Sequence, residues 1–330
     1  GFFSAEDADS EGEEGLFYLW TTEEIFSLLG AEEGKQFSTL FNLEQGGNWA
    51  EGKRHGQTNI PHIRLELEKV ATKLNLNQLQ LTNSLDMWRE HLFAIREYRI
   101  HPLKDDKILT DWNGLMIAAM AYAGRVLNEK SYIHHAERAM EFILTEMKNN
   151  DGGLKKRFRK GESGLSAVLD DYAFVVWGLI ELYQSNFQLN YLEEAVALSE
   201  YQINHFWDDN GNGFYFSADN GEALLSRPKE YYDGAVPAGN SVSAYNFVRL
   251  SRILSKSDFE EISHQIIESN AKSLNRYPSG YSMLLQAVSF ANSSNEVIIF
   301  AGNDEFKNKQ MVNGIFDIYK PNMVVISVTD

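Results

Sequence analysis

The feature that most constrains this chain is a polar cluster that recurs at the start of strongly apolar helical segments. The cluster appears as Leu109-Thr-Asp-Trp-Asn-Gly114, as Leu169-Asp-Asp-Tyr172 and as Asp233-Gly-Ala-Val-Pro-Ala-Gly-Asn-Ser241. A spacing of roughly 60 residues is too long for one helix and its loop, but it suits a helical hairpin with its connection. Hairpins that begin alike bring their polar ends together, so the repeat predicts one site built from several helix starts.

The apolar pattern separates inner helices from outer helices. Residues 114–127 and 172–183 are apolar nearly all the way round, which is typical of helices covered on every side. Residues 131–148, 191–206 and 259–274 carry a single apolar stripe, which is typical of helices with one face in water. The two kinds alternate and are followed by an apolar segment at 281–291. This order predicts a mainly α fold of nested hairpins that close toward a ring.

The connections between these helices repeat as well. Residues 151–154, 209–215 and 11–18 each place an apolar or aromatic residue after glycines, which predicts tight turns and short hairpin strands rather than ligand contacts. The N-terminal third is less regular. Residues 21–24 predict a capping box for a short helix through Leu29, and residues 63–74 and 79–99 predict longer helices.

The C-terminal residues change character. Residues 296–300 and 323–328 are β-branched runs on either side of a helix-compatible stretch at 304–319, which predicts a small β-α-β unit. We therefore expect a helical body over residues 1–294 and a small α/β appendage over residues 295–330. Gly302 after the first strand is only weak evidence for a phosphate contact, because no G-x-G-x-x-G pattern surrounds it.

Composition excludes several classes of partner and chemistry. The net charge of −17 argues against nucleic acid and anionic membrane as main partners, because phosphate binding needs clustered Lys and Arg. The absence of cysteine excludes disulfides, thiolate metal sites and a thiol nucleophile from this piece. No histidine spacing suggests a metal site, so we expect neither a metal nor another cofactor.

No apolar run reaches the roughly 18 to 20 residues that cross a bilayer, and the start lacks a signal pattern. We therefore expect a soluble, cytoplasmic protein, and the missing initial Met suggests a fragment.

The polar clusters predict a binding site if the inner helices run parallel in a ring, because their starts then converge. The converging residues are Asp111, Trp112, Asn113, Asp170, Asp171, Tyr172, Asn240 and Ser241. Carboxylates and amides bind hydroxyl groups, and Trp and Tyr stack on the apolar faces of sugars, so the set suits a polyhydroxylated ligand. A carboxylate pair can also serve as general acid and base in glycosidic or epimerising chemistry. The alternative is that these residues are ordinary helix caps, which the helix dipole also favours.

Two further charged clusters are candidate parts of this site. Glu6, Asp7 and Asp9 place three carboxylates on one loop that could bind a cation through oxygen, although the EF-hand layout for calcium is lacking. Asp106 and Lys107 come shortly before the first polar cluster, and ion pairing with their neighbours is the alternative to a role in the site. Both clusters are retained as candidate contributors.

Four long segments together closely resemble proteins that carry a DUF255-type thioredoxin-like domain, the group that includes the spermatogenesis-associated protein 20 relatives. The segments are SAEDADSEGEEGLFYLWT, HPLKDDKILTDWNGLMIAA, LDDYAFVVWGLIELYQ and YYDGAVPAGNSVSAYNFVRL. The resemblance implies an (α/α) toroid of the six-hairpin glycosidase type, similar to N-acylglucosamine 2-epimerases. It also implies that a thioredoxin-like domain and the first part of the toroid are missing here, so the ring is expected to be incomplete.

The leading hypothesis is a toroid that binds or processes a small carbohydrate-like ligand in its central cavity, with Asp233 added to the lining residues above. Asp106, Asp111 and Asp171 are the candidates for acid or base roles. The alternative is a non-catalytic scaffold that presents a protein client to the missing redox domain. In a third view the carboxylates are structural caps and any activity belongs to the redox domain. A homodimer is expected if apolar inner helices would otherwise meet water.

Overall fold

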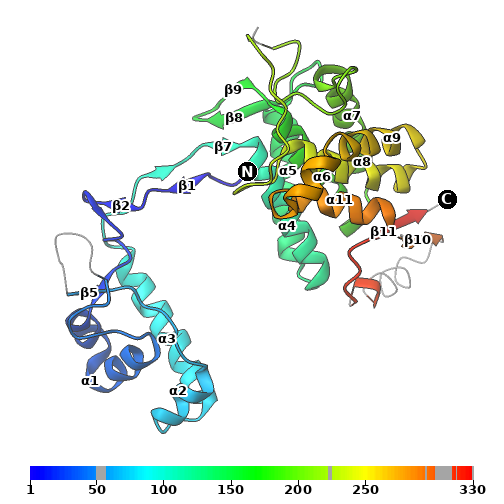
Figure 1. Cartoon of the computed structure of the whole chain (residues 1–330). Coiled ribbons are helices and arrows are strands. Elements are labelled where there is room, and N and C mark those ends of the chain that lie inside the picture. The colour runs from blue at the N-terminus through cyan, green and yellow to red at the C-terminus, as the bar shows by residue number, and fades with distance from the viewer. Residues whose placement is uncertain (50–56, 222–224, 294–295, 302–313, 317, 329–330) are drawn as a thin grey trace. The chain divides into compact units, whose positions relative to one another are not determined.

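The computed structural model describes residues 1–49, 57–221, 225–293, 296–301, 314–316 and 318–328 (Figure 1). The chain divides into two compact units. The smaller unit is Ala5–Asp105, and the larger unit combines Gly1–Ser4 with Asp106–Asp330. This division was not anticipated from the sequence. The expected boundary at residue 294 stays a prediction, and the C-terminal strands belong to the same compact unit as the hairpin helices.

The smaller unit packs three helices around one apolar core, α1 (Thr22–Leu40), α2 (Leu67–Lys73) and α3 (Gln78–Arg96). Its antiparallel strand pairs are β1 (Ala5–Glu6) with β6 (Lys104–Asp105), β2 (Asp9–Ser10) with β3 (Glu13–Glu14), and β4 (Trp20–Thr21) with β5 (Thr58–Asn59). The capping box is confirmed, because the Glu24 amide donates to Thr21 Oγ1 and Glu24 accepts from the Thr21 amide. The helix continues beyond Leu29 because Gly30, with φ of 81°, forms a kink rather than an end.

The larger unit is built from helical hairpins, as the pattern predicted. The hairpins are α4 (Thr110–Val126) with α5 (Lys130–Glu146), α6 (Leu169–Asn186) with α7 (Leu189–Phe206), and α8 (Gly239–Leu254) with α9 (Ser257–Ser269). The short α10 (Ala271–Arg276) and then α11 (Ser282–Asn292) follow. The expected helix at 259–274 is thus two helices, which meet at Asn270.

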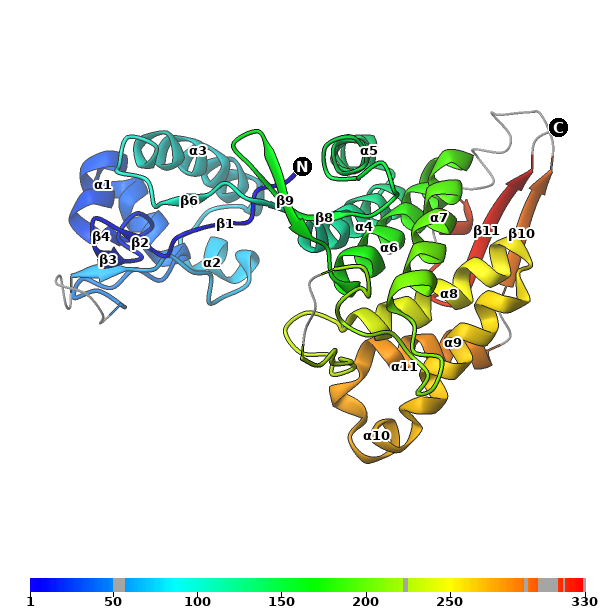
Figure 2. The same cartoon turned by 90° about the horizontal axis from the view of Figure 1, so that it is seen from above.

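The inner helices α4, α6, α8 and α11 lie side by side in that order, and the outer helices pack behind them (Figure 2). Helix α6 is buried along almost its whole length, whereas α5 buries only the stripe that contains Ala136, Met140 and Ile143. The prediction of alternating inner and outer helices is therefore confirmed. The chain is mainly helical, and its hairpins form part of an (α/α) toroid that does not close into a barrel.

The larger unit also contains two small sheets. Strands β7 (Ile108–Leu109), β8 (Lys155–Arg159) and β9 (Glu162–Ser166) form an antiparallel sheet. Strands β10 (Glu296–Ala301) and β11 (Met323–Val328) pair in parallel, as a β-α-β unit requires. Most of the expected helix at 304–319 lies outside the described residues. The Gln184 side chain fixes β11 to α6, since it donates to the Val325 carbonyl at 2.6 Å and accepts from the Val325 amide at 2.9 Å.

None of the helices in the described parts of the chain is both long enough and apolar enough to cross a membrane.

Helices α4 and α6 approach so closely that their crossing depends on a glycine. A Cβ atom on Gly114 would lie 2.6 Å from the backbone carbonyl carbon of Phe174. That separation is too short for any side chain, and a rigid helix backbone cannot move aside cheaply.

We expect Gly114→Ala to lower the free energy of unfolding by about 1–3 kcal/mol, because the overpacking outweighs the gain in helix propensity. Urea denaturation measures the change. Gly164→Ala is the control, since its Cβ would meet only the Arg157 side chain at 3.8 Å. Equal stability of Gly114→Ala and the wild type would contradict the proposed crossing.

Candidate functional site

The inner helices begin with side chains that hold the backbone of a neighbouring connection. Asn113 in α4 accepts a hydrogen bond from the Phe2 amide at 2.6 Å and donates one to the Phe2 carbonyl at 3.0 Å. Asn240 in α8 makes the same pair of bonds with Phe214, at 2.7 and 2.8 Å. Tyr172 in α6 accepts from the Leu154 amide at 2.8 Å. We call Asn113, Tyr172 and Asn240 the anchor residues.

The backbone groups that the anchor residues hold occupy equivalent places in the repeat. Phe2, Leu154 and Phe214 each follow a glycine. Leu154 and Phe214 also form isolated β-bridges with Lys148 and Trp207, which lie just beyond the outer helices α5 and α7. The glycine-rich turns expected in these connections are therefore present, and they are joined to the inner helices by buried hydrogen bonds. Most hydrogen-bonding capacity of the anchor residues is committed to the fold.

Asp233 and Ser241 also serve the backbone. One carboxylate oxygen of Asp233 accepts from the Ala238 amide at 2.9 Å, and the other accepts from the Met283 amide at 2.8 Å, so Asp233 joins the approach to α8 to the start of α11. Ser241 is fully buried and its hydroxyl donates to the Tyr231 carbonyl at 3.4 Å. Their expected part in ligand binding stays a prediction.

The structure brings three of the predicted acidic residues together around a lysine. Lys156 Nζ lies 2.6 Å from Asp111 Oδ2 and 3.0 Å from Asp171 Oδ1. Asp171 also accepts hydrogen bonds from the backbone amides of Asp111 at 3.0 Å and Val168 at 2.8 Å. Asp170 lies beside this group and interacts electrostatically with Lys156 and Asp111. We call Asp111, Lys156, Asp170 and Asp171 the carboxylate cluster.

Lys156 was not identified from the sequence. It lies on β8, a strand with the basic sequence Lys-Lys-Arg-Phe-Arg, which pairs with β7 directly before α4. A basic strand that follows the helical hairpin with the acidic start is a sequence signal for an ion pair. The pairing of β8 with β7 is what brings Lys156, rather than another basic residue of the strand, to these carboxylates.

Burial controls the protonation of the carboxylate cluster. It raises the pKa of Asp171 to about 7, although the Lys156 ammonium opposes the shift. Burial also raises the pKa of Asp170 to about 6, against a hydrogen bond from the Gly239 amide. Burial would lower the pKa of Lys156, but the Asp171 and Asp111 carboxylates outweigh it and the pKa is raised. Asp170 Oδ1 is buried, and no described residue hydrogen-bonds to it. The cluster can therefore hold or release protons near neutral pH.

Access to the cluster is uneven. The Asp171 side chain is fully buried, whereas the Asp111 side chain is 14% exposed. Trp112 follows Asp111 and is 46% exposed. Asp111 and Trp112 are thus reachable from solvent, whereas Asp171 is not. The expected acid or base roles of Asp111 and Asp171 stay predictions.

The remaining candidate residues lie elsewhere. Asp106 pairs with Arg159 on the β8–β9 hairpin at 2.5 Å, and this hydrogen bond holds the pKa of Asp106 below its ordinary value. Lys107 accepts a hydrogen bond from Ser4 Oγ through its carbonyl. Glu6, Asp7 and Asp9 belong to the smaller unit, where Tyr18 Oη donates to Glu6 at 3.2 Å and the Asp9 amide donates to Asp7 at 3.1 Å. Their roles in a site stay predictions.

Across the described residues, no group of three or more His, Asp and Glu side chains has an arrangement that could hold a metal ion.

Comparison with known proteins identifies homologues. The chain is 32% identical to spermatogenesis-associated protein 20 of Rattus norvegicus, over 99% of this chain and 45% of that protein, and the figures for the human protein are the same. An uncharacterized protein of Caenorhabditis elegans is 32% identical over 84% of this chain and 41% of that protein. No family model matches the chain. The chain is therefore homologous to spermatogenesis-associated protein 20 and spans slightly under half the length of that protein.

Several solved structures resemble parts of the chain. A GH76 α-mannanase from Bacteroides thetaiotaomicron is 16% identical with a TM-score of 0.47, over 67% of this chain and 60% of that chain. Cellobiose 2-epimerase from Bacillus thermoamylovorans is 17% identical with a TM-score of 0.44, over 51% of this chain and 45% of that chain. A sugar epimerase from a ruminal bacterium is 13% identical with a TM-score of 0.43, over 75% of this chain and 71% of that chain. At these values the likeness says nothing about substrate.

The raised pKa of Asp170 predicts a specific dependence of stability on pH. A carboxyl group whose pKa is higher in the folded state binds its proton more tightly there, so folding loses stability as pH rises from about 4 to about 6. We expect Asp170→Asn to gain roughly 2–3 kcal/mol of unfolding free energy relative to the wild type across that interval.

Urea denaturation at a series of pH values measures this gain. Asp258→Asn, at the exposed start of the outer helix α9, is the matched control and should follow the wild-type profile. A wild-type minus Asp170→Asn difference that does not change with pH would show that burial does not raise the pKa of Asp170.

Replacing an anchor residue should destabilise the fold. Asn240→Ala leaves the buried amide and carbonyl of Phe214 without partners, which should cost about 2–4 kcal/mol in the free energy of unfolding. Asn275→Ala is the control, because Asn275 is exposed and donates only to the carbonyl of its own helix. Thermal denaturation that leaves Asn240→Ala as stable as Asn275→Ala would remove the anchoring role.

Proposed function

We propose that this chain, a homologue of spermatogenesis-associated protein 20, binds a carbohydrate-like ligand where its inner helices begin. The observation that carries the proposal is an exposed indole, Trp112, directly after a carboxylate, Asp111, that Lys156 and Asp171 hold in place. A half-exposed Trp provides an apolar face on which a sugar ring can stack. The Asp111 carboxylate can accept hydrogen bonds from sugar hydroxyls.

The carboxylate cluster also supports an acid or base role on such a ligand. A general acid or base works best when its pKa lies near the working pH, and burial raises the pKa of Asp170 to about 6. Asp111 can contact the ligand, whereas the fully buried Asp171 acts as a positioning residue through the Asp111 amide and Lys156. This arrangement suits hydrolysis or epimerisation of a sugar. Asp106 remains a further candidate, although Arg159 already engages its carboxylate.

We further propose that the longer protein follows the DUF255-type architecture, with a thioredoxin-like domain outside this chain. The homology to a protein about twice as long supports a missing domain. A homodimer that covers the open edge of the toroid is part of the same proposal. Light scattering on the 330-residue chain tests the dimer.

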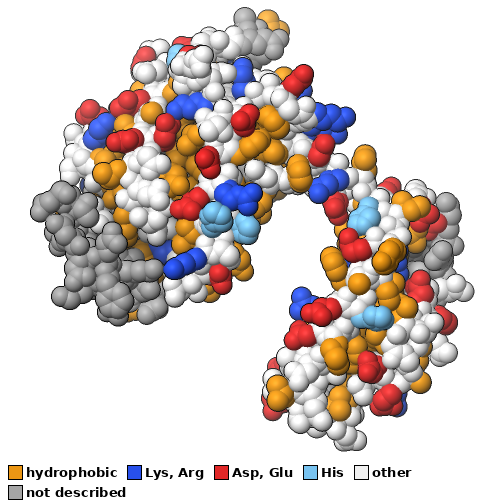
Figure 3. Space-filling model, turned by 180° about the vertical axis from the view of Figure 1, so that it is seen from behind, with side chains coloured by type: hydrophobic (Ala, Val, Ile, Leu, Met, Phe, Trp, Pro, Cys, Tyr) orange, Lys and Arg blue, Asp and Glu red, His pale blue; other side chains and the backbone are white. Residues whose placement is uncertain are grey.

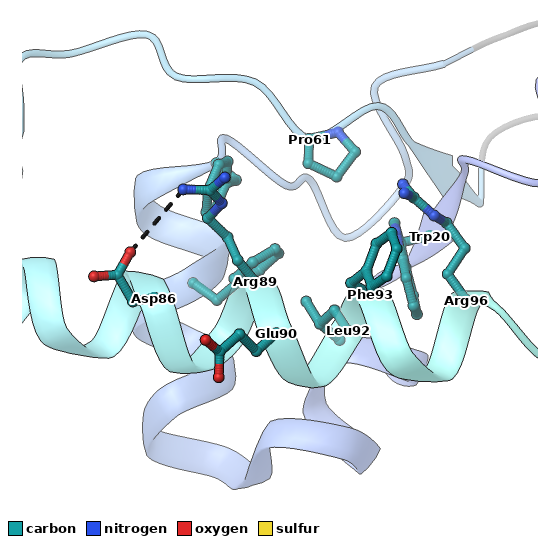
Figure 4. A pocket seen from close by; sticks show the side chains of 10 residues that line it. Trp20, Pro61, Asp86, Arg89, Glu90, Leu92, Phe93 and Arg96 are labelled. Atoms are coloured by element: carbon teal, nitrogen blue, oxygen red, sulfur yellow. Dashed lines mark ion pairs between the residues drawn. The ribbon is translucent and has the colours of Figure 1, made fainter. Parts of the chain in front are cut away.

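A groove in the smaller unit favours a second candidate function, the binding of an apolar protein segment. The groove encloses about 640 Å³, and Trp20, Leu92 and Phe93 line it together with Arg89 and Arg96 (Figure 4). Phe93 is 56% exposed, and Figure 3 shows further hydrophobic side chains at the surface of this unit. An exposed apolar surface of this kind is typical of a protein-binding site. In this reading the chain is a non-catalytic scaffold whose smaller unit binds a protein client for the redox domain outside this chain.

A thermal-shift screen with mono- and oligosaccharides tests the leading proposal on the 330-residue chain. We expect one class of sugar to raise the Tm of the wild type in a concentration-dependent way, because a ligand that binds only the native state stabilises it. Asp111→Asn and Trp112→Ala should lose most of this response, because they remove the polar contact and the stacking surface.

Two acidic positions serve as comparisons in the same screen. Asp258→Asn changes a helix start on an outer helix and should respond like the wild type. Asp106→Asn tests the remaining acid or base candidate. An unchanged response of Asp111→Asn and Trp112→Ala, or no response of the wild type to any sugar, would count against the carbohydrate site and favour the groove of the smaller unit.

A further inference from the structure

A cavity lies in the C-terminal halves of the inner helices, away from the carboxylate cluster. It has a volume of about 210 Å³ and is lined by residues of α4, α6 and α8 together with Phe316 and Met323. Arg125 follows Asp111 by roughly 14 residues along α4, which places it about 21 Å farther along the helix. The cavity is therefore a separate candidate site.

The buried charges among the described residues that line the cavity do not balance. Arg125 and Arg249 face it, and Glu181 is the single acidic side chain in that described lining. Arg125 Nη2 lies 2.8 Å from Glu181 Oε2, and Arg249 Nη1 lies 2.7 Å from Glu181 Oε1. These three side chains are at most 7% exposed. Two buried guanidinium groups thus share one carboxylate, and the described residues that line the cavity supply no second buried carboxylate for the remaining positive charge.

The arginines also retain unused hydrogen-bond donors. Within the described parts of the chain, Arg249 Nε and Arg125 Nε are buried and have no hydrogen-bond partner. Arg249 Nη1 is engaged by Glu181 Oε1 at 2.7 Å. Glu181 Oε1 also accepts a hydrogen bond from Trp177 Nε1 at 3.2 Å. Buried donors without partners cost about 1–3 kcal/mol each, so this arrangement calls for an acceptor.

We propose that this cavity binds a small oxyanion, that is, a carboxylate or a phosphate group. A guanidinium presents donors in a planar fork that matches these groups. The volume is below the range of about 300–1,000 Å³ that drug-sized ligands occupy, so the ligand is a small molecule or one charged end of a longer one. The rings of Tyr122 and Tyr245 lie 5.1 and 5.0 Å from the two guanidinium groups and hold them by cation–π contact.

Titration of the 330-residue chain with inorganic phosphate, acetate or succinate, at constant ionic strength, tests the proposal. We expect at least one of the three anions to raise Tm with increasing concentration. A response to phosphate alone would identify a phosphate site, and a response to acetate or succinate alone would identify a carboxylate site. Arg249→Met should weaken the apparent affinity at least about tenfold, because it removes an unused buried donor and one of the two buried positive charges.

Arg252→Met is the matched control, since Arg252 lies one turn farther along α8 and its guanidinium is already paired with Glu260 at 2.6 Å. It should keep the wild-type affinity. If Arg249→Met does not fold, Arg249→Lys keeps the charge and loses the planar fork, and calorimetry should show weaker anion binding. Equal responses of the wild type and both Arg249 variants, or no response of the wild type, would mean that the arginines only join the helices and would overturn the proposal.

Discussion

The larger unit depends on hydrogen bonds between side chains at the starts of the inner helices and the backbone of the connections. A connection that runs over a helical bundle leaves backbone amides and carbonyls that need partners when they are buried. Asn113, Tyr172 and Asn240 supply those partners for Phe2, Leu154 and Phe214. The connections that contain Leu154 and Phe214 leave the outer helices α5 and α7, so these bonds set where one hairpin ends and the next begins.

The same requirement changes the meaning of the polar clusters. Asn and Tyr side chains that complete a buried backbone cannot also serve a ligand freely, so the proposed site depends on residues two positions earlier. Asp111 and Asp170 occupy those positions, and Lys156 and Asp171 support Asp111 from below the surface. Most polar groups of the three clusters thus stabilise the fold, and only two of the clusters leave groups that the proposed site would use.

The inner helices carry opposite charges at their two ends. Carboxylates gather where α4 and α6 begin, and arginines gather toward the ends of α4 and α8, as the helix dipole favours. At each end a single residue of opposite charge pairs with two residues of the cluster. Lys156 pairs with Asp111 and Asp171, and Glu181 pairs with Arg125 and Arg249. Such partly compensated clusters are costly to bury, which is why they are the best places to look for ligands.

The sequence by itself determined the hairpin repeat, the inner and outer helices, the parallel terminal strands and the positions of the polar clusters. These features follow from local sequence patterns, namely apolar periodicity, β-branched runs and recurring polar residues, each of which is contained in a short stretch of the chain. The tertiary structure alone decided which polar groups meet. Asp171 and Lys156 are brought together by the pairing of β7 with β8, and Arg125, Glu181 and Arg249 by the packing of three helices far apart in the chain. Burial, and with it the raised pKa values of Asp170 and Asp171, is a property of those long-range contacts and has no local signature in the sequence.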